Sequence, residues 1–318
     1  MVVIIGAGPI GLAVSIELQK RGIRSLIIDR GTIVNSIYHY PVNMTFFSTS
    51  VNLEIGNIPF ISHGPKPTRR EALEYYRRVA EHYHLELKLF EEVIGITGSD
   101  GDFTIQTSKG TCQADKLVLA TGFYGQENKL GIPGEELVKV SHYYDEPHRY
   151  AWQNLIVVGG GNSAVDAALE TWRCGANVSM VVKYNDIKPS VKYWVKPDIE
   201  NRIREGSIPA WFNSTLAAVR EGEADILTPD GMITIPNDFV LAMTGYHPHF
   251  ELMKRLGISI SNDEKRMPTY NSQTLETNRN GVYVAGVVCG GMDTSSLFIE
   301  NTRIHAEQIA RDIRQKSG

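Results

Sequence analysis

The fold is decided by the stretch Val3-Ile4-Ile5-Gly6-Ala7-Gly8-Pro9-Ile10-Gly11, close to the start of the chain. Its apolar residues predict a short buried strand, and its glycines predict a tight turn that opens a helix over residues 12–20. At such a junction the backbone N–H groups can approach a pyrophosphate, and the positive end of the helix dipole favours the bound anion. The stretch therefore predicts a nucleotide-binding strand–turn–helix unit.

The same pattern occurs a second time near the middle of the chain. The apolar strand Leu155-Ile156-Val157-Val158 is followed by Gly159-Gly160-Gly161-Asn162-Ser163-Ala164, and a helix is predicted to about Arg173. The spacing from the first glycine of the turn to the glycine after the helix is the same in both copies. The repeat predicts two nucleotide sites, because each turn follows a strand and opens a helix. A tight turn that binds no ligand is the alternative for each copy.

The residue that ends the second strand of each unit indicates which nucleotide is bound. In the first unit it is Asp29, whose carboxylate can accept a hydrogen bond from a ribose hydroxyl and would repel a 2′-phosphate. The equivalent residue of the second unit is Val182, and Lys183, Lys188 and Lys192 follow it. The first unit therefore suits FAD or NAD, and the second favours NADP(H). The alternative for the lysines is a solvated loop.

Composition is typical of a globular chain with two domains. The chain has 318 residues, of which 42% are hydrophobic, and a net charge of −4, so it lacks the strongly basic character of a nucleic-acid-binding protein. No apolar run is long enough for a membrane span, and we expect a cytoplasmic protein that binds neither membrane nor nucleic acid. Three cysteines lie far apart, with no Cys-x-x-Cys, as in a reducing compartment. The nine histidines show no paired spacing typical of a metal site, since His82 and His84, two apart on a predicted helix, cannot share a face. No metal site is expected.

The rest of the chain alternates strands with helices. Three further apolar strands each end in a small residue and a glycine, at Thr121-Gly122, Thr244-Gly245 and Ala285-Gly286. Thr68 and Glu71 form a capping box that opens a helix, and a long final helix is predicted over residues 298–313. This order predicts an α/β protein with two Rossmann-like, doubly wound nucleotide-binding domains.

The layout resembles the thioredoxin-reductase-like flavoproteins over essentially the whole chain. That resemblance implies an FAD-binding domain split in sequence, residues 1–121 and 246–318, around an inserted NADPH-binding domain, residues 122–245. Gly286 and the final helix would close the flavin side, and the helix start near Ile299 would direct its dipole at the flavin. The FAD-binding residues implied are Gly6, Gly8, Pro9, Ile10, Gly11, Asp29, Arg30, Ser36, Ser48, Thr49, Val93, Thr121, Gly122, Gly286 and Ile299. The NADPH-binding residues implied are Gly159, Gly161, Asn162, Ser163, Ala164, Lys183, Lys188, Lys192 and Gly245.

Within that group, several motifs are similar to the bacillithiol disulfide reductase family. They are Asn35-Ser36-Ile37-Tyr38, Asn43-Met44-Thr45-Phe46-Phe47-Ser48-Thr49, Lys66-Pro67-Thr68-Arg69, Gly245-Tyr246-His247-Pro248 and Phe298-Ile299-Glu300-Asn301. The resemblance implies an NADPH-dependent flavin oxidoreductase that reduces a low-molecular-weight thiol disulfide. The electron acceptor expected is therefore a small-molecule disulfide or a small redox protein, and the chain is expected to form a homo-oligomer.

The sequence departs from both families at its thiols. Thioredoxin reductases carry a Cys-x-x-Cys before the second glycine turn, and residues 141–154 contain no cysteine. Bacillithiol disulfide reductases have cysteine after the Gly-Pro of the first turn, where this chain has Ile10. The catalytic group is therefore unassigned. Cys289 is a candidate because it follows Gly286 closely, although a small buried hydrophobe is the alternative. Cys112 and Cys174 are expected to be structural.

Three other functions fit the same pair of nucleotide sites. One is flavin monooxygenation, although the Phe-x-Gly-x-x-x-His motif typical of those enzymes is absent. The second is ferredoxin or flavodoxin reduction by an enzyme that lacks the cysteine pair. The third is not catalytic: an NADPH redox sensor that reports its state to a partner.

Overall fold

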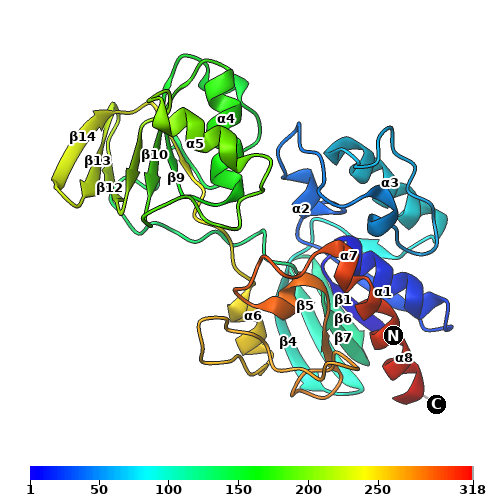
Figure 1. Ribbon diagram of the computed structural model, residues 1–318. Helices are drawn as coiled ribbons and strands as arrows, with labels where there is room; N and C mark the ends of the chain where they lie inside the picture. The colour runs from blue at the N-terminus through cyan, green and yellow to red at the C-terminus, as the bar shows by residue number, and fades with distance from the viewer. Residues whose placement is uncertain (317–318) are drawn as a thin grey trace. The chain divides into compact units, whose positions relative to one another are not determined.

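The computed structural model describes residues 1–316, which divide into two compact units. The first unit is Met1–Gln126 together with the chain from Tyr246 onward, and the second unit is Glu127–Gly245 (Figure 1). The first unit is therefore discontinuous in sequence, and the second is inserted into it. Within residues 1–316, no helix combines the length and the apolar character that a bilayer crossing needs.

A five-stranded parallel sheet in the order β16-β7-β1-β2-β3 forms the centre of the first unit. Its strands are β1 Val2–Ile5, β2 Ser25–Ile28, β3 Leu87–Lys88, β7 Lys116–Leu119 and β16 Val282–Val284. A smaller antiparallel sheet contains β4 Val93–Ser99, β5 Asp102–Thr107 and β6 Gly110–Ala114. The helices are α1 Pro9–Gln19, α2 Asn35–Tyr38, η1 Ser50–Leu53, α3 Arg69–His82, α6 Phe250–Arg255, η3 Gly286–Gly290, α7 Ile299–Thr302 and α8 Ile304–Lys316.

The second unit repeats this architecture. Its parallel sheet has the order β11-β10-β9-β15-β8, and a three-stranded antiparallel sheet has the order β12-β13-β14. The strands are β8 Val140–Ser141, β9 Asn154–Val158, β10 Asn177–Val182, β11 Ala210–Phe212, β12 Thr215–Val219, β13 Glu223–Thr228, β14 Gly231–Pro236 and β15 Phe239–Ala242. The helices are η2 His148–Tyr150, α4 Asn162–Arg173 and α5 Lys196–Arg204. The predicted doubly wound α/β architecture is confirmed in both units.

The sequence explains these elements directly. The side chains of β1 are no more than 6% exposed, as expected for an apolar strand that is covered on both faces. The capping box of α3 is confirmed, since the Thr68 side chain accepts from the Glu71 amide and the Glu71 carboxylate accepts from the Thr68 amide. In α1 the helix begins at Pro9, whose missing N–H costs nothing at the first position.

The prediction of one long final helix is wrong. The helical segment breaks at Arg303, which separates α7 from α8. The Thr302 hydroxyl donates to the Phe298 carbonyl at 2.6 Å, a local bond that bends helices. The Arg303 guanidinium also donates to the carbonyls of Val51 and Glu54, which ties the break to η1. The helix that begins at Ile299 therefore has only four residues, and its dipole is correspondingly weak.

Candidate nucleotide sites

In the first unit, the carboxyl ends of three adjacent parallel strands meet at one edge of the sheet. Gly6 follows β1, Thr121-Gly122 follows β7, and Gly286 follows β16. The chain leaves β1 toward β2 on one side, while β7 lies on the other, which makes this edge a topological switch point. Such an edge is where open α/β sheets bind ligands.

The three glycines of the first turn serve different purposes. A Cβ atom at Gly6 would lie 2.4 Å from the Ala120 carbonyl oxygen, and one at Gly11 would lie 2.0 Å from the Gly6 carbonyl oxygen. Both glycines are therefore required by the fold itself. Gly8 is the N-cap of α1 with a φ of −72°, and a Cβ there would meet nothing within 4 Å. Since the fold does not require Gly8, its open side fits the close approach of a ligand to the helix N-terminus.

Asp29 lies beside this turn and holds it. One carboxylate oxygen accepts from the Ala7 amide at 2.7 Å, and the other accepts from the Gly31 amide at 2.8 Å. Each oxygen keeps a further lone pair for a ribose hydroxyl. Next to Asp29, the Arg30 guanidinium donates to the Gly125 carbonyl at 2.8 Å, so it fastens the loop after Gly122 to the end of β2.

The other residues implied for FAD fall into two places. Ser36 lies on α2, and Val93 is the first residue of β4. The segment just before β4 is held beside Asp29, because the Glu91 amide donates to the Asp29 carbonyl at 2.9 Å. Ser48 and Thr49 precede η1, which packs against the four-residue α7 that begins at Ile299. The structure therefore brings the 48–49 segment to Ile299.

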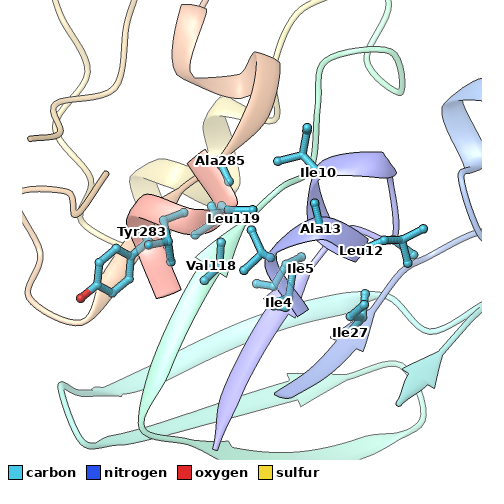
Figure 2. Close-up of a cluster of buried hydrophobic side chains, with 14 of the residues drawn as sticks. Ile4, Ile5, Ile10, Leu12, Ala13, Ile27, Val118, Leu119, Tyr283 and Ala285 are labelled. Atoms are coloured by element: carbon cyan, nitrogen blue, oxygen red, sulfur yellow. The ribbon is translucent and has the colours of Figure 1, made fainter. Parts of the chain in front are cut away.

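Ile10 is packed against the closing turn. It is the second residue of α1 and is 7% exposed, and a Cβ atom on Gly286 would lie 3.2 Å from its Cγ1. Figure 2 shows Ile10 at the same end of the sheet as Ala285, the residue before Gly286. Beside this turn, the Thr121 hydroxyl is buried and has no hydrogen-bond partner among residues 1–316. An orphaned hydroxyl at the sheet edge is consistent with a polar ligand there.

The second unit has a matching edge. Gly159 follows β9 with a φ of +131°, and a Cβ there would lie 2.6 Å from the Met243 carbonyl oxygen, so the fold requires this glycine. Gly161 is the N-cap of α4, and a Cβ there would have only the Lys188 Cδ within 4 Å, at 3.9 Å. Gly161 thus repeats the open position of Gly8. Gly245 follows β15 at the same edge, with a φ of +89°.

A loop over residues 183–192 is fastened to the glycine turn. The Lys188 amide donates to the Gly160 carbonyl at 2.9 Å, and the Lys192 amide donates to the Asn162 side chain at 3.0 Å. The Asn162 amide group also donates to the Ser190 carbonyl at 3.2 Å. Ser163 and Ala164 continue the first turn of α4. The loop that carries the three lysines is therefore held at the N-terminus of α4.

The three lysines occupy different environments. Lys183 is exposed directly after β10, and the exposed Lys188 lies beside Gly161, with its Nζ 5.5 Å from the centre of the Tyr184 ring. Lys192 is largely buried, and its Nζ contacts the Asp166 carboxylate at 2.7 Å. Lys183 and Lys188 can therefore reach a phosphate, while the Lys192 charge is already paired with a carboxylate on α4.

Val182 takes the place that Asp29 has in the first unit. It is fully buried at the end of β10, and a Cβ atom on Gly160 would lie 2.9 Å from its Cγ1. Val182 thus packs against the glycine turn of the second unit, whereas Asp29 hydrogen-bonds to the glycine turn of the first. The second site has no carboxylate at this position to repel a phosphate group.

None of the three cysteines lies at the N-terminus of α1 or α4, where the glycine turns are. Cys174 is exposed at the end of α4, and Cys112 is half-buried on β6, where burial raises the pKa of its thiol. Cys289 is fully buried in η3, and burial raises the pKa of its thiol to about 12. A nucleophilic cysteine needs the opposite shift. In residues 1–316 no group of His, Cys, Asp or Glu side chains is arranged to hold a metal ion.

Sequence reasoning missed one residue of the closing turn. The Gly286 amide donates to the His305 Nδ1 at 3.1 Å, and the Cys289 Sγ lies 3.9 Å from the same nitrogen. Burial lowers the pKa of His305. No sequence pattern marks this histidine, because it lies in the first turn of α8, far along the chain from its partner.

The sequence matches the pyridine nucleotide-disulphide oxidoreductase family model over residues 3–286. It is 42% identical over 316 residues to the Bacilliredoxin reductase Bdr of Bacillus subtilis (strain 168), across 99% of this chain and 97% of that protein. The solved structure of Bacillithiol Disulfide Reductase Bdr (YpdA) from Staphylococcus aureus has 42% identity and a TM-score of 0.96, covering 100% of this chain and 98% of that one. The thioredoxin reductase of Lactococcus lactis, 20% identical with a TM-score of 0.78, covers 99% of this chain and 97% of that chain and shares the fold.

Proposed function

The chain belongs to the pyridine nucleotide-disulphide oxidoreductase family, and from that premise we propose that it uses NADPH and FAD to reduce a disulfide of the bacillithiol type. Its membership and its thioredoxin-reductase-like fold make it a pyridine-nucleotide-dependent flavoprotein oxidoreductase. The choice of FAD, of NADPH and of the disulfide is our inference. One observation carries it: each unit has a glycine at a helix N-terminus with its side-chain direction open, flanked by Asp29 in one unit and by Val182 in the other.

The residues of the first unit support FAD. The open side of Gly8 and the free N–H groups at the start of α1 suit a pyrophosphate. Asp29 presents lone pairs at the position where a ribose hydroxyl would donate. We assign residues 1–121 and 246–318 to FAD binding, with Ser48, Thr49 and the Gly286 turn toward the flavin.

The residues of the second unit support NADPH over NADH. Gly161 offers the pyrophosphate position at the start of α4. Val182 supplies no carboxylate, and Lys183 and Lys188 offer two exposed ammonium groups within the loop fastened to the turn. We assign residues 122–245 to NADPH binding. Lys192 adds less charge to this site than the other two lysines, because its Nζ already contacts the Asp166 carboxylate.

When bound, the two cofactors supply the redox chemistry, which is hydride transfer from the nicotinamide to the flavin. The residues of this chain bind and orient them. Gly6 and Gly11 fix the backbone of the first glycine turn, and the Asp29 carboxylate accepts from the Ala7 amide within it. The buried Ile10 packs against Gly286 and keeps water from the closing turn.

The acceptor receives its electrons without help from an enzyme thiol. Ile10 stands where bacillithiol disulfide reductases carry cysteine, and the Cys289 thiol is held protonated by burial. A disulfide acceptor, R–S–S–R, then takes two electrons and two protons from the reduced enzyme and gives two thiols. A small redox protein with a disulfide satisfies the same balance, in agreement with the name of the Bacillus subtilis relative.

The test is anaerobic NADPH oxidation by the purified protein with bacillithiol disulfide, glutathione disulfide, bacilliredoxin and a ferredoxin as separate acceptors. We expect turnover with a bacillithiol-containing disulfide, whether free or on bacilliredoxin, and little with the others. Turnover only with ferredoxin would replace this function by ferredoxin reduction. In a parallel aerobic assay, oxygen consumption equal to NADPH oxidation would indicate a monooxygenase. No turnover with any acceptor, with or without oxygen, would favour a sensor.

A further inference from the structure

The turn after β16 is held by a side chain from α8. The Ala285 amide still donates to the Leu119 carbonyl, as in the parallel sheet, at 2.9 Å. One residue later the sheet pattern ends, and the Gly286 amide donates to the His305 Nδ1 at 3.1 Å. His305 therefore supplies the acceptor that a neighbouring strand would have supplied.

The same turn is constrained from its other side. Gly286 has a φ of +81°, and a Cβ atom on it would lie 3.2 Å from the Ile10 Cγ1, so its missing side chain leaves room for Ile10. The turn is thus clamped between the start of α1 and the start of α8. Both helix starts lie where the predicted flavin site closes.

The hydrogen bond fixes the state of the His305 ring. Because Nδ1 accepts a hydrogen, the neutral ring carries its own hydrogen on Nε2. Burial keeps the ring neutral by lowering its pKa, and it is the sole cause of the shift. The titratable group that faces it is the Cys289 thiol of η3. Across the described residues of α1, α7, η3 and α8, no charged side chain contributes to the shift.

We propose that His305 is a positioning residue for the flavin: its neutral ring holds the Gly286 amide and so the closing turn, and protonation of Nδ1 releases that turn. The proposal rests on the proposed function, since it takes the first unit as the flavin site. A protonated Nδ1 is a donor and can no longer accept from Gly286. Retention of the flavin should therefore weaken in acid.

The pH window follows from the direction of the shift. His305 ordinarily titrates near 6.5, and its pKa in the folded protein is lower. Above 6.5 the ring is neutral in both folded and unfolded chains, and the contribution of the bond is complete. As the pH falls below 6.5 the unfolded chain takes up the proton first, so the contribution of the bond to folding stability declines. The turn itself is released as the pH approaches the lower pKa of His305 in the folded protein, where Nδ1 is protonated.

The experiment measures the rate of FAD release from the holoprotein by recovery of flavin fluorescence, from pH 8 to pH 5. His305→Asn places an amide oxygen where Nδ1 lies and does not titrate in this range, while His305→Leu removes the acceptor. His84→Asn is the matched control, because His84 is exposed with a φ of +50°, a conformation that asparagine tolerates. We expect release by the wild type and the control to rise about fivefold as the pH falls. His305→Asn should stay slow and flat, and His305→Leu should be fast and flat.

Two results would overturn the proposal. One is an acid-dependent release in His305→Asn that matches the wild type, and the other is slow release by His305→Leu at pH 8. If His305→Leu does not fold, the comparison of wild type with His305→Asn still decides. A wild type that binds no FAD at all would instead contradict the proposed function, so the two failures are distinguishable.

Discussion

The Asp29 carboxylate accepts the Ala7 amide at 2.7 Å, which joins the end of β2 to the glycine turn after β1. In the second unit the same two positions are Val182 and Gly160, and they pack against each other without a hydrogen bond. The residue at the strand end thus does two things at once: it supports the turn, and it sets the charge at the adjoining ribose position. Under the proposed function, this difference at the strand end makes the first site suit FAD and the second suit NADPH.

Replacing Asp29 tests the support of the turn. Asp29→Ala removes the acceptor for the Ala7 and Gly31 amides, and hydrogen bonds to a charged group are worth about 1.5 to 3 kcal/mol. We expect a lower unfolding midpoint and an FAD dissociation constant raised by about tenfold or more. Differential scanning fluorimetry and FAD titration of the apoprotein measure the two effects. Asp115→Ala, at an exposed carboxylate, is the control; unchanged FAD affinity in Asp29→Ala would remove the ribose role.

Gly8→Val separates ligand binding from folding. A Cβ atom at Gly8 meets nothing within 4 Å and its φ is negative, so the fold should tolerate valine. The side chain would occupy the path of a pyrophosphate, and we expect a folded, colourless protein. Circular dichroism and flavin absorbance report the two properties. Gly222→Val is the matched control, since Gly222 is exposed and a Cβ atom there would also meet nothing within 4 Å, but it lies outside the two glycine turns that open α1 and α4. A yellow Gly8→Val protein speaks against pyrophosphate binding there.

Lys183 should determine the choice of coenzyme. It is exposed at the end of β10, and a charged contact to a 2′-phosphate is worth about 1.5 to 3 kcal/mol. We expect the wild type to prefer NADPH over NADH by about tenfold or more in kcat/KM. Lys183→Ala should erode that preference chiefly through KM for NADPH. Lys183→Arg should keep it, and equal use of both coenzymes by the wild type would count against this site.

The cysteines should be dispensable. The Cys289 thiol is buried with a pKa of about 12, and burial also raises the pKa of the Cys112 thiol. Cys174 lies at the C-terminal end of α4, the opposite end of that helix from its glycine turn. We expect a variant with Cys112→Ser, Cys174→Ser and Cys289→Ala to keep flavin reduction and turnover nearly intact under steady-state assay. Cys289 becomes alanine because a buried hydroxyl would need a partner. If Cys289→Ala alone is reduced by NADPH but no longer turns over its acceptor, the thiol-free mechanism fails.

Much of the fold follows from local pattern in the sequence. The two glycine turns, the apolar strands around them and the Thr68 capping box each carry their cause within a few residues, and the structure has them as predicted. The break at Arg303 is not marked by such a local pattern, because part of what holds it, the bonds from the guanidinium to the carbonyls of Val51 and Glu54, is remote in sequence. Helical periodicity continues across such a break, and the pattern therefore predicts one helix.

The residues of the two candidate sites also fall into those that the sequence predicts and those that only the fold reveals. Gly8 and Asp29 can be singled out from spacing alone, since a turn and the strand after it are close in the chain. The bond between Gly286 and His305 forms only when α8 packs beside the turn after β16, and the pairing of Lys192 with Asp166 forms only when the 183–192 loop folds onto α4. The sequence does not distinguish the three lysines of the 183–192 loop. The fold shows that Lys192 is paired with a carboxylate, whereas Lys183 and Lys188 are exposed.

The central claim is that this chain takes hydride from NADPH on its flavin and passes it on without a thiol of its own. Anaerobic titration of the holoprotein with NADPH, followed at the flavin absorbance band, tests it most directly. We expect complete bleaching at about one NADPH per FAD, because all three cysteines of the sequence lie within residues 1–316 and are free, so they form no disulfide to accept a second pair of electrons. Consumption of a second equivalent before the endpoint, or no bleaching at all, would contradict the account.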